Sequence, residues 1–119
     1  MHQLPPYLWL IAPVSDEPHT SMMNWRVFEV VLREQLRPSL HLVGYAFKLD
    51  EGRVSSAVQS LDLERMVAMT SSGRCYALLG EPGYDGRAEF VWREWVGATG
   101  ARVIGDVTAK LHHRTGDAG

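Results

Sequence analysis

The sequence predicts an α+β fold, in which a curved antiparallel β-meander of about five strands packs against one C-terminal α-helix. Residues 24–79 contain short runs rich in β-branched and aromatic residues. Turn-forming residues separate these runs, at the spacing that is typical of an antiparallel meander. After these runs, four apolar residues recur at the spacing of one helical face: Ala88, Val91, Trp92 and Trp95. Such a helix provides the apolar cover that one side of the sheet needs.

We expect five strands, over residues 25–32, 40–47, 53–61, 65–70 and 74–79. A further strand is expected over 102–107, and a short helix over 61–69 is the alternative to the fourth strand. Because side chains alternate along a strand, Phe28 should lie on one face of the first strand, with Trp25 and Val27 on the other.

The expected helix runs from Asp85, whose side chain is suited to an N-cap, to Gly97. A rigid turn precedes it, because Pro82 cannot donate a hydrogen bond to a strand ladder and so ends the fifth strand. We expect Trp92 and Trp95 to be buried against the sheet, since they share the apolar face of the helix.

Length and composition indicate one globular domain in the cytoplasm. A chain of 119 residues can bury a core without disulfides or metals. Its 45% hydrophobic and 22% charged residues argue against wholesale disorder, and its net charge of -2 weighs against nucleic-acid binding, which needs a basic surface. With a single cysteine, Cys75, no internal disulfide can form, which favours a reducing compartment.

The chain divides into a proline-rich N-terminal arm over 1–22, a single α+β domain over 23–109 and a flexible polar tail over 110–119. The apolar run of the arm, 8–14, is too short to span a bilayer, and no Lys or Arg precedes it as in a secretory signal. No membrane association is therefore expected. Three interpretations of the arm stay open: it docks on the domain, it binds a partner, or it precedes the natural start.

No group of residues forms a recognisable catalytic or metal signature. Cys75 is expected to be a buried structural thiol, and His112 and His113 lack a third ligand at a metal-binding spacing. The glycine-rich turn at 80–86 lacks the Lys of a phosphate-binding loop. We therefore expect no enzymatic activity, no catalytic residue, no metal site and no cofactor.

The residues expected to bind a partner lie in the arm, in the turn and on the helix. Tyr84 is an amphipathic anchor at the tip of the turn, and Phe90 points away from the apolar helical face. The full set is Tyr7, Trp9, Glu81, Tyr84, Asp85 and Phe90. The alternative for the turn is a purely structural link between strand and helix.

Five segments resemble a family of small, uncharacterised proteobacterial proteins often carried on mobile genetic elements: Trp25-Arg-Val-Phe-Glu-Val30, His41-Leu-Val-Gly-Tyr45, Glu51-Gly-Arg-Val-Ser-Ser-Ala-Val58, Thr70-Ser-Ser-Gly-Arg74 and Gly80-Glu-Pro-Gly-Tyr-Asp-Gly-Arg-Ala-Glu-Phe-Val-Trp92. The resemblance covers residues 23–99 and excludes the arm. It implies no activity and no functional residues. The association with mobile elements implies an accessory role, such as inhibition of host defence or regulation of transfer.

The expected function is that of a small soluble, non-enzymatic protein-interaction module, an accessory or inhibitor protein of a mobile element. Its partner is a protein of unknown identity, and a homodimer stays open. The alternative is a nucleic-acid-associated regulator that uses scattered arginines with Tyr45, Phe47 or Tyr76 on an open sheet face. A third hypothesis is a small enzyme or ligand binder with a polar cavity around His41 or Cys75.

Overall fold

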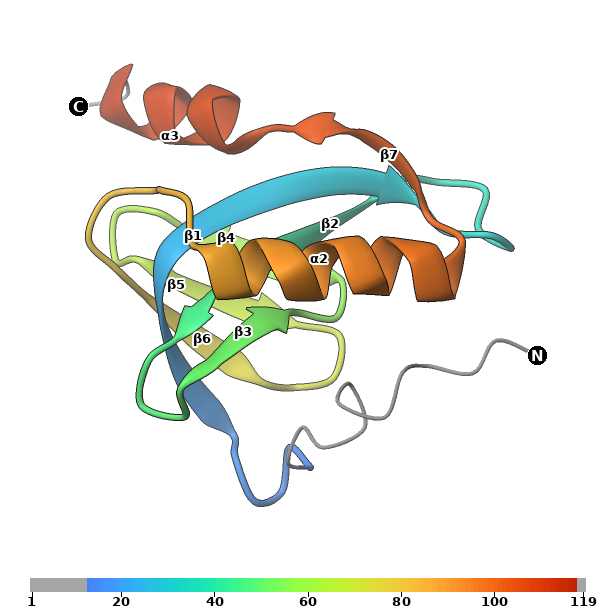
Figure 1. Cartoon of the computed structure of the whole chain (residues 1–119). Coiled ribbons are helices and arrows are strands. Elements are labelled where there is room, and N and C mark those ends of the chain that lie inside the picture. The colour runs from blue at the N-terminus through green and yellow to red at the C-terminus, as the bar shows by residue number, and fades with distance from the viewer. Residues whose placement is uncertain (1–12, 118–119) are drawn as a thin grey trace.

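The computed structural model describes residues 13–117, whose sheet has seven strands (Figure 1). The strands are β1 (His19–Val31), β2 (Ser39–Ala46), β3 (Glu51–Val54), β4 (Val58–Asp62), β5 (Val67–Thr70), β6 (Cys75–Leu79) and β7 (Arg102–Asp106). The helices of the described part are α2 (Gly86–Thr99) and α3 (Thr108–Asp117). Neither of these helices, of 14 and 10 residues, is long and apolar enough to cross a membrane.

Strand β1, of 13 residues, is the centre of the sheet, because it has neighbouring strands on both of its edges. One edge pairs with β2 in the antiparallel direction. The other edge pairs first with β6, in parallel, and then with β7, antiparallel. The strand order is β3-β2-β1-β6-β5-β4, with β7 beside the second half of β1. The sheet is therefore mostly antiparallel, as expected, with one parallel pair.

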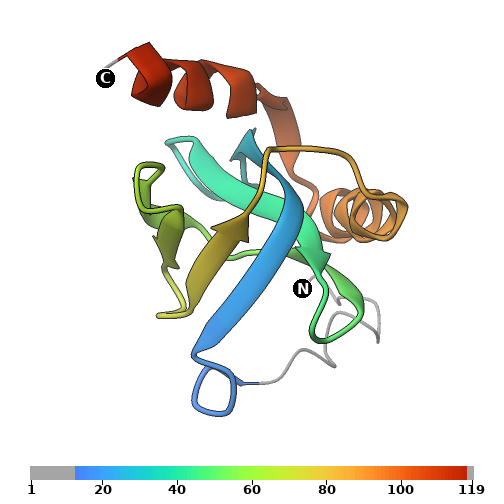
Figure 2. The ribbon, with the colours of Figure 1, turned by 90° about the vertical axis from the view of Figure 1, so that its left-hand side faces the viewer.

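The sheet is strongly curved (Figure 2). Its two outermost strands, β3 and β4, are joined by only three residues, 55–57, which span roughly 14 Å at most. Such a short link can join opposite edges only if the sheet curls to bring them together. Two buried residues hold the link in place: the Ser55 hydroxyl accepts from the Leu42 amide at 2.9 Å, and the His41 imidazole donates to the Ser55 carbonyl at 2.8 Å.

Two apolar cores lie on opposite faces of the sheet. The inner core is enclosed by the curved strands and contains Met22, Trp25, Val27, Leu42, Ala68, Tyr76 and Leu78. The second core lies beneath α2 and contains Phe28, Val30, Val43, Val54, Ala88, Trp92 and Ala101. The predicted alternation of Phe28 against Trp25 and Val27 is thus confirmed. A bulge at Asn24, whose φ is +49°, shifts the register, so that Met22 and Trp25 both reach the inner core.

Helix α2 begins after Asp85, as the sequence predicts, but it continues through Gly97 to Thr99, and both of its ends are capped. The Asp85 carboxylate accepts from the amides of Arg87 and Ala88, and Gly100 adopts the left-handed conformation at the C-terminal end. The first turn of the helix packs directly on β3. A side chain at Gly52 would overlap the backbone of Arg87 and Ala88, so glycine is required for this contact.

The structure corrects the expected fold in strand number and helix position. The expected strand over 53–61 is divided into β3 and β4, since the chain must cross from one edge of the sheet to the other. Helix α2 is not the last element, because β7 and α3 follow it. Strand β1 begins at His19, within the expected arm, and α3 occupies most of the expected flexible tail, where Leu111 packs against the inner core.

Candidate functional site: the outer face of β1, β5 and β6

Helix α2 covers only part of its side of the sheet, and the rest of that side carries exposed apolar residues. Tyr76 and Leu78 of β6 point into the inner core, so the residues between them point outward. The pairing register places the outward residues of the three strands side by side. Together they form what we call the outer face: His19, Ser21 and Met23 of β1, Val67 and Met69 of β5, and Cys75, Ala77 and Leu79 of β6.

The outer face is apolar, although it faces solvent. Its four large apolar side chains, Met23, Val67, Met69 and Leu79, are 37–42% exposed. An antiparallel sheet with one solvated face usually has polar residues on that face. Only His19 and Ser21 follow this rule on the outer face. A contiguous exposed apolar patch on a folded protein commonly marks a site of interaction with a partner.

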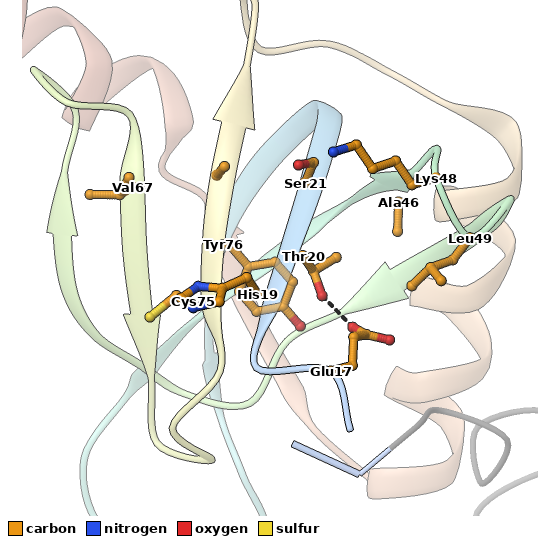
Figure 3. Close-up of a pocket in the computed structure, with 11 residues that line it drawn as sticks. Glu17, His19, Thr20, Ser21, Ala46, Lys48, Leu49, Val67, Cys75 and Tyr76 are labelled. Atoms are coloured by element: carbon orange, nitrogen blue, oxygen red, sulfur yellow. Dashed lines mark hydrogen bonds between the residues drawn. The ribbon is translucent and has the colours of Figure 1, made fainter. Parts of the chain in front are cut away.

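A hollow of about 320 Å³ opens between the outer face and the tip of the β2–β3 hairpin. We call it the Lys48 hollow, and its lining residues are Glu17, His19, Thr20, Ser21, Ala46, Lys48, Leu49, Val67, Cys75, Tyr76 and Ala77. Figure 3 shows the Lys48 ammonium extended from the hairpin toward Ser21. Leu49, beside it on the hairpin, is 47% exposed and adds another apolar side chain to this surface.

A buried ion-pair network supports the chain next to the Lys48 hollow. The Arg53 guanidinium is almost fully buried and donates to both carboxylate oxygens of Glu17, at 2.6 and 3.2 Å. Arg74, also buried, donates from Nε to the Glu17 carbonyl at 2.8 Å, and the same Nε lies 3.4 Å from the carboxylate. Glu17 also accepts from the Thr20 hydroxyl, and Glu51 forms a second ion pair with Arg53.

The arginines set the charge of Glu17. Burial alone would raise the pKa of the Glu17 carboxyl, but hydrogen bonds from Arg53 and Thr20, with the charges of Arg53 and Arg74, outweigh burial and lower it. Glu17 is therefore ionised at neutral pH and balances the buried cations. This carboxylate helps to fasten the segment before β1 to the sheet, together with the bonds that the Glu17 and Pro18 carbonyls accept from Arg74 Nε and the Cys75 amide.

Cys75 and His41, around which a polar cavity was one hypothesis, have different contacts in the structure. Cys75 is half-buried on the outer face, with its Sγ 3.6 Å from the Met69 sulfur, whereas a buried thiol was expected. His41 is buried on β2, where Ser39 Oγ donates to Nε2 at 2.8 Å and Nδ1 donates to Ser55. Burial lowers the pKa of His41, although the bond to the Ser55 carbonyl partly opposes the shift, so the imidazole is neutral and holds the link between β3 and β4.

The residues expected to bind a partner around the turn lie on a different surface from the outer face. Tyr84 is 66% exposed, with the Arg26 guanidinium 5.6 Å from the centre of its ring. Phe90 is 57% exposed on α2, and Glu81 is exposed with its carboxylate 3.7 Å from the His112 ring. A second hollow, of about 530 Å³, lies beside the turn and is lined by Arg26, Pro82, Gly83, Asp106, Thr108, Ala109 and His112. Tyr7 and Trp9 lie outside the described residues.

Much of the turn is explained by folding. On the edge of β1, the ladder is open between β6 and β7, and the turn fills this gap: the Gly83 amide donates to the Trp25 carbonyl at 3.2 Å. The Trp25 indole donates to the Gly80 carbonyl at 3.1 Å. Asp85, expected to bind a partner, has its carboxylate engaged as the N-cap of α2. Only Glu81 and Tyr84 remain available for a partner at the turn.

Replacing Asp85 by Ala is expected to lower the free energy of unfolding by about 1 kcal/mol, since two amides of the first turn of α2 lose their acceptor. Urea denaturation followed by circular dichroism measures this loss. Asp85→Ser is the control and should retain most of the stability, because a serine hydroxyl also caps a helix. A wild-type midpoint for Asp85→Ala would contradict the assigned role.

Several residues expected to contact a nucleic acid are engaged in other contacts in the described part of the structure. Tyr76 is buried in the inner core, and Tyr45 is bonded to Asp50 and Arg87 rather than presented to solvent alone. The arginines that were expected to form a face pair with carboxylates instead: Arg53 and Arg74 with Glu17, Arg26 and Arg93 with Glu89, and Arg87 with Asp50. The open face that does exist is apolar.

Comparison with known proteins adds no assignment: no protein-family model, curated protein or solved structure matches the chain. Within residues 13–117, no three His, Cys, Asp or Glu side chains are grouped as metal ligands. The function must therefore be inferred from the surface itself.

Sequence reasoning missed the outer face, although a signal was present. The stretches Val67-Ala-Met69 and Cys75-Tyr-Ala-Leu-Leu79 are apolar at every position, whereas a strand with one solvated face alternates. Such strands are buried on both faces or carry an exposed apolar face. The choice between these two depends on how far the helix extends over the sheet, which the sequence does not reveal.

Proposed function

We propose that the protein is a non-enzymatic protein-interaction module that binds its partner through the outer face. The observation that supports this proposal is the contiguous apolar surface of Met23, Val67, Met69 and Leu79, which α2 leaves uncovered. Fully burying a large apolar side chain contributes roughly 1.5–3 kcal/mol. These four are 37–42% exposed, so each would contribute a fraction of that on binding, and together they favour association. Methionines suit such a surface, because their flexible side chains adapt to a partner.

The resemblance to proteins carried on mobile elements extends this proposal to a biological setting. A small protein that acts by occupying a surface of another protein fits an accessory or inhibitor protein of a mobile element, such as an inhibitor of host defence. Since residues 23–99 carry that resemblance, they include most of the outer face.

Photo-crosslinking tests the proposal. A photoreactive amino acid at Met69 is expected to yield a specific protein adduct in the source cells, identified by mass spectrometry. The adduct should disappear when Val67→Lys is added, because a charge two residues away on the same face disrupts apolar docking. Leu36→Lys is the matched control, since Leu36 is fully exposed in the β1–β2 loop, and it should leave the adduct unchanged.

Two results would contradict this function. One is the absence of any adduct at Met69 when the folded state is retained, as judged by circular dichroism. The other is an adduct that persists equally with Val67→Lys and Leu36→Lys. Retardation of DNA or RNA at low salt, reversed at high salt, would instead favour the nucleic-acid alternative.

A further inference from the structure

The Lys48 hollow is large enough to receive a bulky apolar side chain. Its volume of about 320 Å³ lies at the lower end of the range for ligand pockets, roughly 300–1,000 Å³. Leu49 and Val67 approach it from the hairpin and from β5, and Ala46 and Ala77 contribute small side chains that leave room. An apolar group that entered here would lie against Val67, one of the four large apolar side chains of the outer face, and against Leu49 of the hairpin.

The charge around the Lys48 hollow is positive. The titratable residues that line it are Glu17, His19, Lys48, Cys75 and Tyr76. The Glu17 carboxylate is balanced by the buried Arg53 and Arg74. Lys48 makes no ion pair with the residues that the structure describes, and His19 carries no negative charge in either protonation state. A group that enters the hollow would therefore lie near one charge without an ion-pair partner among the described residues, the ammonium of Lys48.

We infer that the Lys48 hollow receives a bulky apolar side chain flanked by a carboxylate, so that the docking segment of the partner is an acidic–apolar peptide. This inference rests on the proposed function and specifies the chemistry of its partner. The apolar side chain fills the hollow, and the carboxylate pairs with the Lys48 ammonium at its rim. A rim charge of this kind discriminates between partners more than it adds affinity.

Peptide titrations observed by NMR test the inference on the full chain. The probe is acetyl-Gly-Ser-Leu-Asp-Ser-Gly-amide, compared with versions that carry Asn or Lys in place of Asp. The Asp peptide is expected to shift the signals of Ala46, Val67 and Ala77, which line the hollow. Its dissociation constant should be about two- to fivefold lower than that of the Asn peptide, the range of an exposed ion pair.

The preference for Asp should be lost in Lys48→Gln and at high salt, and retained in Lys110→Gln, a matched loss of an exposed lysine on α3. Equal binding of the three peptides, shifts at residues outside the hollow, or no shifts up to the solubility limit would each overturn the inference. None of these results alters the crosslinking at Met69, so the failure of this inference is distinguishable from failure of the proposed function.

Discussion

Replacing Glu17 by Gln is expected to lower the free energy of unfolding by about 3–5 kcal/mol, the largest loss we predict for a polar residue. The substitution keeps the shape of the side chain but removes the charge that balances the buried Arg53 and Arg74. Breaking a buried ion pair from one side costs energy of this size, because it leaves buried positive charge that is no longer fully balanced. Glu51 still pairs with Arg53 in the variant, so the loss is expected toward the lower end of the range. Urea denaturation followed by tryptophan fluorescence measures it.

Glu64→Gln is the control, because Glu64 is exposed in the turn between β4 and β5, and its replacement should change the free energy of unfolding by less than about 0.5 kcal/mol. A Glu17→Gln protein as stable as this control would contradict the network. A second comparison pairs Arg53→Met with Glu17→Gln: the double variant should lose less than the sum of the two single variants, since both remove the same interaction.

The pH dependence of stability follows from the same carboxylate. The pKa of Glu17 is lower in the folded protein than its ordinary value of about 4.5. Its contribution is therefore fully present above the unfolded-state pKa and is lost as the pH falls through the lower, folded-state pKa. Below pH 4.5, the stability of the wild-type protein should decline more steeply than that of Glu17→Gln. Parallel declines would show that Glu17 is not the titrating group.

Replacing Trp92 by Ala is expected to cost about 3–5 kcal/mol, because this ring is buried in the core beneath α2. It stacks on Phe28, with 4.5 Å between the ring centres, and on Trp95, with 5.5 Å. The sequence predicts an equal loss for Trp95→Ala, but Trp95 is only half-buried and packs at the edge of the core against Trp92 and His41. A smaller loss is therefore expected there.

Phe90→Ala is the matched control on the same helix. Its ring is 57% exposed, so its removal should cost less than about 1 kcal/mol. In urea denaturation, the loss in free energy of unfolding is expected to be largest for Trp92→Ala, smaller for Trp95→Ala and smallest for Phe90→Ala. A loss for Trp92→Ala no greater than that for Phe90→Ala would be incompatible with α2 as the cover of this face.

The sequence predicts structure correctly where the structure depends on residues close together in the chain. The helix could be predicted because its period, its N-cap at Asp85 and its terminal glycines all lie within one short stretch. The alternation of Phe28 and Trp25 between two faces could be read for the same reason. The division of residues 53–61 between two strands could not, because it depends on Ser55 bonding to a strand 13 residues earlier in the chain.

The candidate site was harder to predict than the fold. Asp85 was expected to bind a partner, but its carboxylate accepts hydrogen bonds from the Arg87 and Ala88 amides at the start of α2. Met23 and Leu79 are neighbours only because β1 runs in parallel beside β6, a pairing between segments more than fifty residues apart. Contacts at that separation leave no periodic trace in the sequence, so the outer face emerges only when the strands are assembled.

By itself, the sequence determined the α+β class, the turn at Pro82, the start and apolar face of the helix, and the alternation of Trp25, Val27 and Phe28 between the two faces of β1. These follow from side-chain periodicity, capping and backbone constraints, which act between neighbours in the chain. The tertiary structure alone decided the curvature of the sheet, the balance of Glu17 against two buried arginines, and the extent of the cover that α2 provides. These depend on the entropy and geometry of long-range contacts, and they leave the apolar outer face open to a partner.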